Sequence, residues 1–142
     1  MGPQCLLVDK GRRGLEAIII YFSVISQYRA GIMEMVIENR QSGNAWVSLP
    51  RDLPRTDGWI AVQDCALLGD IWWVENPNGV WESMLIVDCA RPPDTDLAYE
   101  WMEEENVAME VDYQTAVRWG TVGKGIKALW SKKYPTGPML ER

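Results

Sequence analysis

The stretch WIAVQDCALLGDIWWVENPNGVWESMLIVDCA, residues 59–90, decides the fold. Residues 71–75 and 80–87 are rich in β-branched and aromatic side chains, which favour strands. Between them, residues 76–79 (NPNG) supply a tight turn whose glycine accepts a positive φ angle. The stretch therefore predicts a β-hairpin, preceded by another strand over residues 59–62.

Outside this stretch, the patterns predict more strands and a few short helices. Further strands are expected over residues 17–27, 45–49, 107–111 and 125–130. Helices are expected over residues 31–40 and 96–105, and between an N-cap at Asp112 and a terminating Gly120. The sequence thus predicts one mainly β domain with short helices over residues 17–130, between an N-terminal extension (1–16) and a C-terminal tail (131–142).

The composition excludes several classes of function. The chain has 142 residues, a net charge of −6 and 47% hydrophobic residues, which fits one globular domain. An acidic chain lacks the basic face that phosphates require, so we expect no nucleic-acid partner. Histidine is absent, which removes the usual general base and the commonest metal ligand. We therefore expect neither a metal site nor a cofactor.

The apolar run within residues 17–25 is too short to cross a bilayer, which needs about 20 residues. Basic residues precede it, as in a signal peptide, but Asp9 and Glu16 interrupt that pattern and no small-residue cleavage site follows. Its β-branched content favours a buried strand, and we expect no membrane span.

Two Asp-Cys pairs, Asp64-Cys65 and Asp88-Cys89, follow similar apolar segments. The two cysteines have two interpretations. They form a disulfide, which indicates an oxidising compartment, or they are buried free thiols, which indicate nothing about location. Cys5 stands alone near the start of the chain.

The two aspartates are the candidate catalytic residues. Asp88 is the better candidate acid because it ends an apolar strand, where burial raises the pKa of a carboxyl group. Asp64 is the natural second carboxylate for glycosidic cleavage if the two strand ends are adjacent. The structural alternative is that each aspartate caps a turn by accepting hydrogen bonds from local backbone amides.

Four segments carry a resemblance to a known family. Residues 53–62 (LPRTDGWIAV), 85–93 (LIVDCARPP), 109–120 (MEVDYQTAVRWG) and 125–130 (GIKALW) follow one another in a characteristic order. This order resembles the double-psi β-barrel of the rare lipoprotein A-like and barwin-like families. In the third segment, the family has a strand, an Asp, and a short helix whose apolar face plugs the barrel.

The resemblance covers residues 45–130 and implies a closed six-stranded double-psi β-barrel, here with an N-terminal strand-helix extension. It implies a protein that binds or remodels polysaccharides outside the cytoplasm, with Asp88 matching the catalytic Asp of the family. Lytic transglycosylases of the family pair that Asp with a His in the preceding loop. Residues 48–57 contain no His, so whether the chain is a glycan-cleaving enzyme stays open.

Trp72, Trp73, Trp81 and Arg91 are the candidate substrate-binding residues. The tryptophans lie on the predicted hairpin, where an exposed indole can stack on a sugar ring, and core packing is the alternative. The adjacent Trp72 and Trp73 must point to opposite faces of the sheet. Arg91 can hold an anionic sugar substituent or pair with Asp94.

Two functions therefore compete. The first is a secreted or otherwise extracytoplasmic barrel that binds or remodels a polysaccharide such as peptidoglycan or β-glucan. The second is a non-enzymatic structural or interaction subunit of a larger assembly, for example a virion, with a protein partner. The missing histidine and the eight tryptophans favour the second function.

Overall fold

The structure, a computed structural model, describes residues 4–9, 18–43, 45, 47–90 and 96–135. The strands are β1 (Gln4–Asp9), β2 (Ile18–Gln27), β3 (Gly58–Val62), β4 (Ile71–Glu75), β5 (Trp81–Cys89), β6 (Val107–Val111) and β7 (Ile126–Ser131). The helices are α1 (Ile32–Gln41), α2 (Asp96–Glu104) and α3 (Tyr113–Trp119), with a short 3-10 helix η1 (Cys65–Leu67) after β3.

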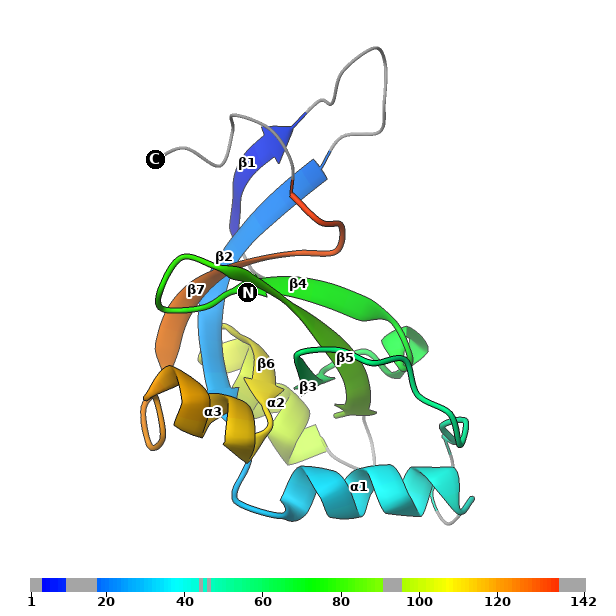
Figure 1. The fold of residues 1–142 in the computed structure, drawn as a ribbon. Coiled ribbons are helices and arrows are strands. Elements are labelled where there is room, and N and C mark those ends of the chain that lie inside the picture. The colour runs from blue at the N-terminus through cyan, green and yellow to red at the C-terminus, as the bar shows by residue number, and fades with distance from the viewer. Residues whose placement is uncertain (1–3, 10–17, 44, 46, 91–95, 136–142) are drawn as a thin grey trace.

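Six strands close into a mixed barrel (Figure 1). Around the barrel the order is β2-β6-β3-β5-β4-β7, and β7 pairs back with β2. The β2–β6 and β3–β5 pairs are parallel, and the other pairs of the ring are antiparallel. The predicted fold class, mainly β with a closed six-stranded barrel and short helices, is confirmed.

One expectation at the N-terminal side needs correction. The strand predicted over residues 45–49 was wrong, because the described residues of this range form no strand. The sixth barrel strand is instead β2, whose ten residues reach β1, β6 and β7. The predicted extension over residues 1–16 contains β1, which pairs antiparallel with β2 outside the closed ring. Figure 1 shows β1 and the start of β2 projecting beyond the barrel.

The barrel interior is filled with apolar side chains. Ile60, Met84, Ile86 and Met109 are fully buried there, together with Ala116 of α3. This packing places α3 at one end of the barrel. The polar group that enters this end is Glu82, which accepts hydrogen bonds from Asn76, Arg118 and Trp119.

A second apolar cluster lies outside the barrel, between the sheet and α1. Figure 1 shows α1 running across this side of the barrel. The helix contributes Met33 and Ile37, which are spaced by four residues and therefore share one face. The buried residues that complete the cluster are Leu49, Ala61, Leu85 and Val87.

Asp112 joins α3 to β3, and Gly58 makes this junction possible. The Asp112 carboxylate accepts hydrogen bonds from the Thr115 amide and hydroxyl and from the Trp59 amide. The predicted N-cap at Asp112 and the terminating Gly120 are both confirmed, and Gly120 has a left-handed conformation with a φ angle of 73°. A Cβ atom on Gly58 would lie 2.4 Å from Thr115 Oγ1 and 2.7 Å from Met84 Cε.

We expect Gly58→Ala to lower the free energy of unfolding by about 2–3 kcal/mol, the upper part of the range for overpacked cores. The reason is that Thr115 Oγ1 is held by Asp112 at 2.6 Å and cannot move away without breaking that bond. Urea denaturation measures the effect. Gly125→Ala is the matched control, because its Cβ would meet only Val24 Cγ1 at 3.6 Å. Equal losses in both variants would contradict the steric argument.

Candidate functional site

A disulfide between Cys65 and Cys89 links η1 to the end of β5. The two Cα atoms lie 5.0 Å apart. This pairing resolves the two interpretations of the cysteines in favour of the disulfide. Disulfides persist in oxidising compartments, so the bond is compatible with an extracellular protein. Among the described residues, no helix is both long and apolar enough to cross a membrane.

A β-bulge aims Asp88 out of the barrel. The β3–β5 register runs from Ile60 opposite Ile86 to Ala61 opposite Asp88, so Val87 is the extra residue. Val87 packs in the cluster beneath α1. Asp88 emerges on the same outer side, where it meets Arg40 of α1. Bulges re-aim side chains in this way at the ends of strands.

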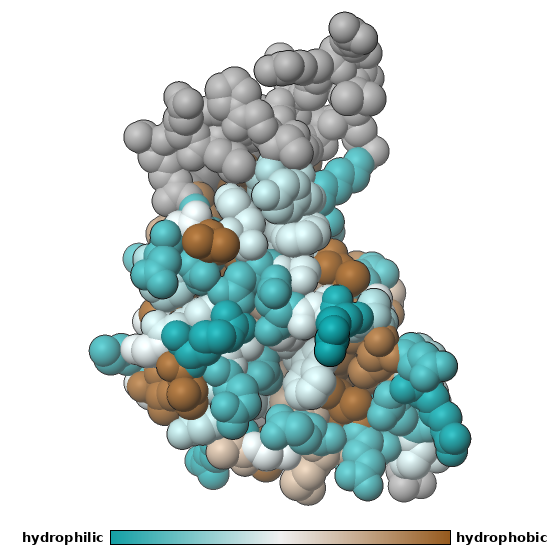
Figure 2. Space-filling view, in the orientation of Figure 1, coloured by the Kyte–Doolittle hydropathy of each residue, from teal (hydrophilic) through white to brown (hydrophobic). Residues whose placement is uncertain are grey.

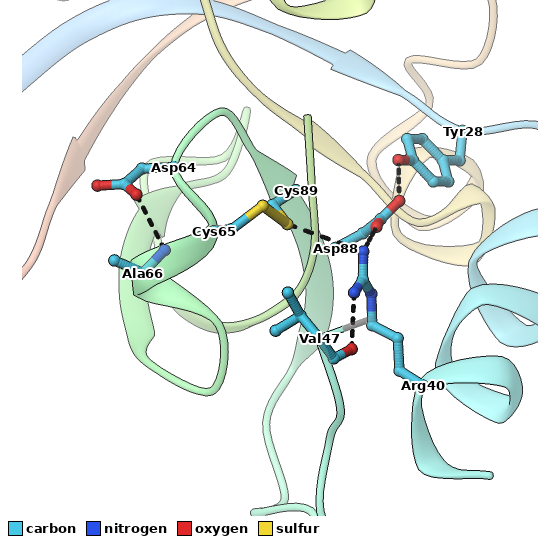
Figure 3. Close-up of a disulfide and its surroundings, with 8 residues drawn as sticks. All are labelled: Tyr28, Arg40, Val47, Asp64, Cys65, Ala66, Asp88 and Cys89. Atoms are coloured by element: carbon cyan, nitrogen blue, oxygen red, sulfur yellow. Dashed lines mark hydrogen bonds and ion pairs between the residues drawn. A yellow bond between two sulfur atoms is a disulfide. The ribbon is translucent and has the colours of Figure 1, made fainter. Parts of the chain in front are cut away.

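Asp88 is held by two donors (Figure 3). Arg40 Nη2 lies 2.6 Å from Oδ1, and the Tyr28 hydroxyl donates to Oδ2 at 2.5 Å. The side chains of Arg40 and Asp88 are only 9% and 14% exposed. Arg40 also donates from Nη1 to the Val47 carbonyl at 2.8 Å. Asp88 therefore anchors α1 to the barrel through a largely buried ion pair, and removing one partner would leave a buried charge.

Glu110 is a titratable residue of this region that the sequence analysis missed. Asp88 on β5 and Glu110 on β6 both lie opposite Ala61 on β3. These three residues therefore form one row across three adjacent strands. Burial and, secondarily, the negative charge of Asp88 raise the pKa of Glu110 to about 7. Burial and the charge of Asp88 also raise the pKa of Tyr28 above its ordinary value, so its hydroxyl keeps its proton well above neutral pH. The one sequence signal for Glu110 is its place in an otherwise apolar short strand.

Asp64 lies on the opposite side of the disulfide from Asp88 (Figure 3). Its Oδ1 accepts a hydrogen bond from the Ala66 amide at 2.9 Å, so it caps η1. The carboxylate is otherwise exposed to solvent. The structure thus separates the two predicted catalytic aspartates: Asp88 faces Arg40 and Tyr28, whereas Asp64 faces a cavity.

This cavity, which we call the mouth cavity, has a volume of about 320 Å³. Three aromatic rings line it, because Trp130 stacks between Tyr21 and Trp72 with centroid distances of 4.5 and 4.3 Å. Lys132 Nζ lies 5.7 Å from the Trp72 ring, within the range of a cation–π contact. The polar residues that line the cavity are Gln63, Asp64, Asn106 and Lys132.

The other predicted binding residues are dispersed. Trp72 is buried in the barrel and Trp73 packs outside it, edge-on against Tyr134 at 4.7 Å, so the expectation of opposite faces is confirmed. Trp81 is half-buried at the start of β5, far along that strand from Cys89. Arg91 lies outside the described residues.

The described residues contain no group of three or more acidic or cysteine side chains that could hold a metal ion. Comparisons of the chain with family models, curated proteins and solved structures find no match. The mouth cavity and the Asp88 region are therefore interpreted from their own chemistry.

We expect Glu110→Gln to change how stability depends on pH. Folding raises the pKa of Glu110 from 4.5 to about 7, so the folded state keeps a proton that the unfolded state releases. The free energy of unfolding of the unmodified chain should therefore fall as the pH rises from about 4.5 to about 7. Glu110→Gln has no ionisable group at this position, so its free energy of unfolding lacks this decrease, which is at most about 3 kcal/mol.

Urea denaturation between pH 4 and pH 8 measures the difference between the two proteins. Ser26→Ala is a suitable control, because Ser26 lies opposite Glu110 on β2 and has no ionisable side chain. The difference between Glu110→Gln and the unmodified chain should grow up to pH 7 and then stay constant. A difference that does not change with pH would show that Glu110 titrates normally.

Proposed function

We propose that this chain is a polysaccharide-binding barrel of the rare lipoprotein A-like and barwin-like kind, with its glycan site in the mouth cavity. The observation that carries the proposal is the lining of this cavity, in which stacked aromatic rings meet a carboxylate, two amides and an ammonium group. Small-ligand sites combine an apolar lining with a few polar groups in this way, often in the mouths of barrels.

A sugar ring matches both parts of this lining. Its C–H faces are apolar and pack on aromatic rings, here above all on the half-buried Tyr21, because Trp72 and Trp130 are only 6% and 3% exposed. Its hydroxyl edges form hydrogen bonds. Asp64 and the side-chain amides accept hydrogen bonds from hydroxyl groups, and Lys132 donates them. The net charge of −6 favours neutral glycans such as β-glucan, or the sugar backbone of peptidoglycan, over strongly anionic polymers. The disulfide supports a location outside the cytoplasm.

The contacts of Asp88 support binding rather than cleavage. A general acid must present a proton to the leaving oxygen. Asp88 instead accepts a hydrogen bond from the Tyr28 hydroxyl and pairs with Arg40. Neither oxygen is directed to the mouth cavity, whose lining includes Asp64 and not Asp88. In this proposal Asp88 positions α1, and any glycan-cleaving activity is absent.

Calorimetric titration with linear β-glucan oligosaccharides and with soluble peptidoglycan fragments tests the proposal. We expect Asp64→Asn to weaken binding by about tenfold or more, the usual loss for a hydrogen bond to a charged group. Asparagine still caps η1, so the fold should be retained. Asp52→Asn, an exposed substitution on the loop before β3, is the matched control and should bind normally.

Mass spectrometry of the same mixtures then separates binding from cleavage. We expect no soluble products from either polymer. Products that appear with the unmodified chain and disappear with Asp88→Asn would establish a glycan-cleaving enzyme and contradict the binding-only proposal. Absence of binding to every glycan would remove the proposed function itself.

The alternative, a structural or interaction subunit of a larger assembly, is favoured by one observation. Ile32 and Met35 on α1 are 41% and 58% exposed. On the face that Figure 2 draws, the apolar residues lie in separate small groups among hydrophilic ones. Light scattering distinguishes the two functions, because a chain that stays monomeric would count against the assembly subunit.

A further inference from the structure

We infer that the mouth cavity binds the end of a glycan chain, a terminal sugar unit, and not an internal segment. This inference rests on the proposed function and specifies which part of the polysaccharide the site recognises. It depends on how the barrel is closed behind the cavity and on which elements surround it.

The cavity is blind because the barrel behind it is packed. β6 runs from Val107, which lines the cavity, to Val111, which directly precedes the N-cap of α3. The cavity and α3 therefore lie at opposite ends of β6. Between these ends the interior is filled by Ile60, Ile86 and Met109, each with no exposed surface. A sugar chain cannot continue through the barrel.

The far end of the barrel is closed as well. Ala116 of α3 is fully buried against the interior cluster, and Trp119 packs beside it. The Trp119 indole and the Arg118 guanidinium both donate to Glu82, at 2.9 and 2.6 Å. These contacts satisfy the buried carboxylate and fix α3 in place. The barrel thus has one entrance on the cavity side.

The walls of the cavity come from elements around most of the mouth. They include Tyr21 of β2, Leu67 of η1, Met102 of α2 and Lys132 directly after β7. A site that binds an internal segment must be open at two sides, so that the polymer can enter and leave. A cavity of about 320 Å³ is also near the lower limit of roughly 300 Å³ for small-ligand sites. Both features fit one short end of a chain.

The polar lining suits a terminal unit for a chemical reason. The last sugar of a chain carries a free hydroxyl group where an internal sugar carries a glycosidic oxygen. A hydroxyl group both donates and accepts hydrogen bonds, whereas a glycosidic oxygen only accepts them. The Asp64 carboxylate only accepts hydrogen bonds, so it favours a unit with the additional O–H, and Lys132, which also lines the cavity, can donate to a sugar oxygen.

A length series of linear β-glucan and peptidoglycan oligosaccharides, titrated into the full chain, tests this inference. We expect the affinity per molecule to stop rising after the first few sugar units. A cyclic β-glucan, which has no ends, should bind at least about tenfold more weakly than a linear oligosaccharide of the same number of units. Asp64→Asn should reduce this preference, and Asp52→Asn should leave it unchanged.

The outcomes separate the inference from the proposed function. Equal binding of cyclic and linear glucans, or an affinity that keeps rising with length, would overturn end recognition and leave glycan binding intact. If the chain binds only peptidoglycan fragments, the length series alone tests the inference. An affinity that reaches a plateau supports end recognition, and an affinity that keeps rising contradicts it. No binding of any oligosaccharide would overturn both the inference and the proposed function.

Discussion

The antiparallel pairing of β2 with β7 is the contact on which the rest of the structure depends. It joins Ile20–Ile25 to Ile126–Ser131 and turns a row of strands into a closed ring. Closure gives the barrel an inside, which the apolar residues of β3, β5 and β6 fill, and an outside, which α1 covers. The same pairing brings Tyr21 beside Trp130, so the aromatic lining of the mouth cavity is a direct result of closure.

Local patterns predicted most of the elements but not how they assemble. The NPNG turn, the N-cap at Asp112 and Gly120 are short-range signals, and each was confirmed because its geometry depends on neighbouring residues. The strand predicted over residues 45–49 was wrong because Leu49 is apolar for a different reason. It packs beneath α1 and pairs with no strand. β2 completes the barrel by pairing with β7, whose residues lie about a hundred positions later in the chain. Such a contact leaves no local signal.

The candidate site was predicted in part for the same reason. The repeated Asp-Cys pattern left open whether the two strand ends are adjacent, and the pairing of Val62 with Cys89 and the disulfide show that they are. Adjacency of the backbones did not bring the carboxylates together. The bulge at Val87 turns Asp88 toward α1, while η1 turns Asp64 toward the mouth. Glu110 and Arg40 could not be assigned to this region, because only the register and the helix position place them there.

The partner of each aspartate decides what its carboxylate can do. A largely buried carboxylate beside a guanidinium is costly to disturb, and this suits a fixed structural contact. Asp88 in its ion pair with Arg40 is of this kind. An exposed carboxylate at the edge of an aromatic cavity keeps lone pairs for a ligand, and Asp64 is of this kind. The disulfide keeps these two environments adjacent but separate, so the contact that holds α1 does not share residues with the lining of the mouth cavity, the site proposed for a sugar.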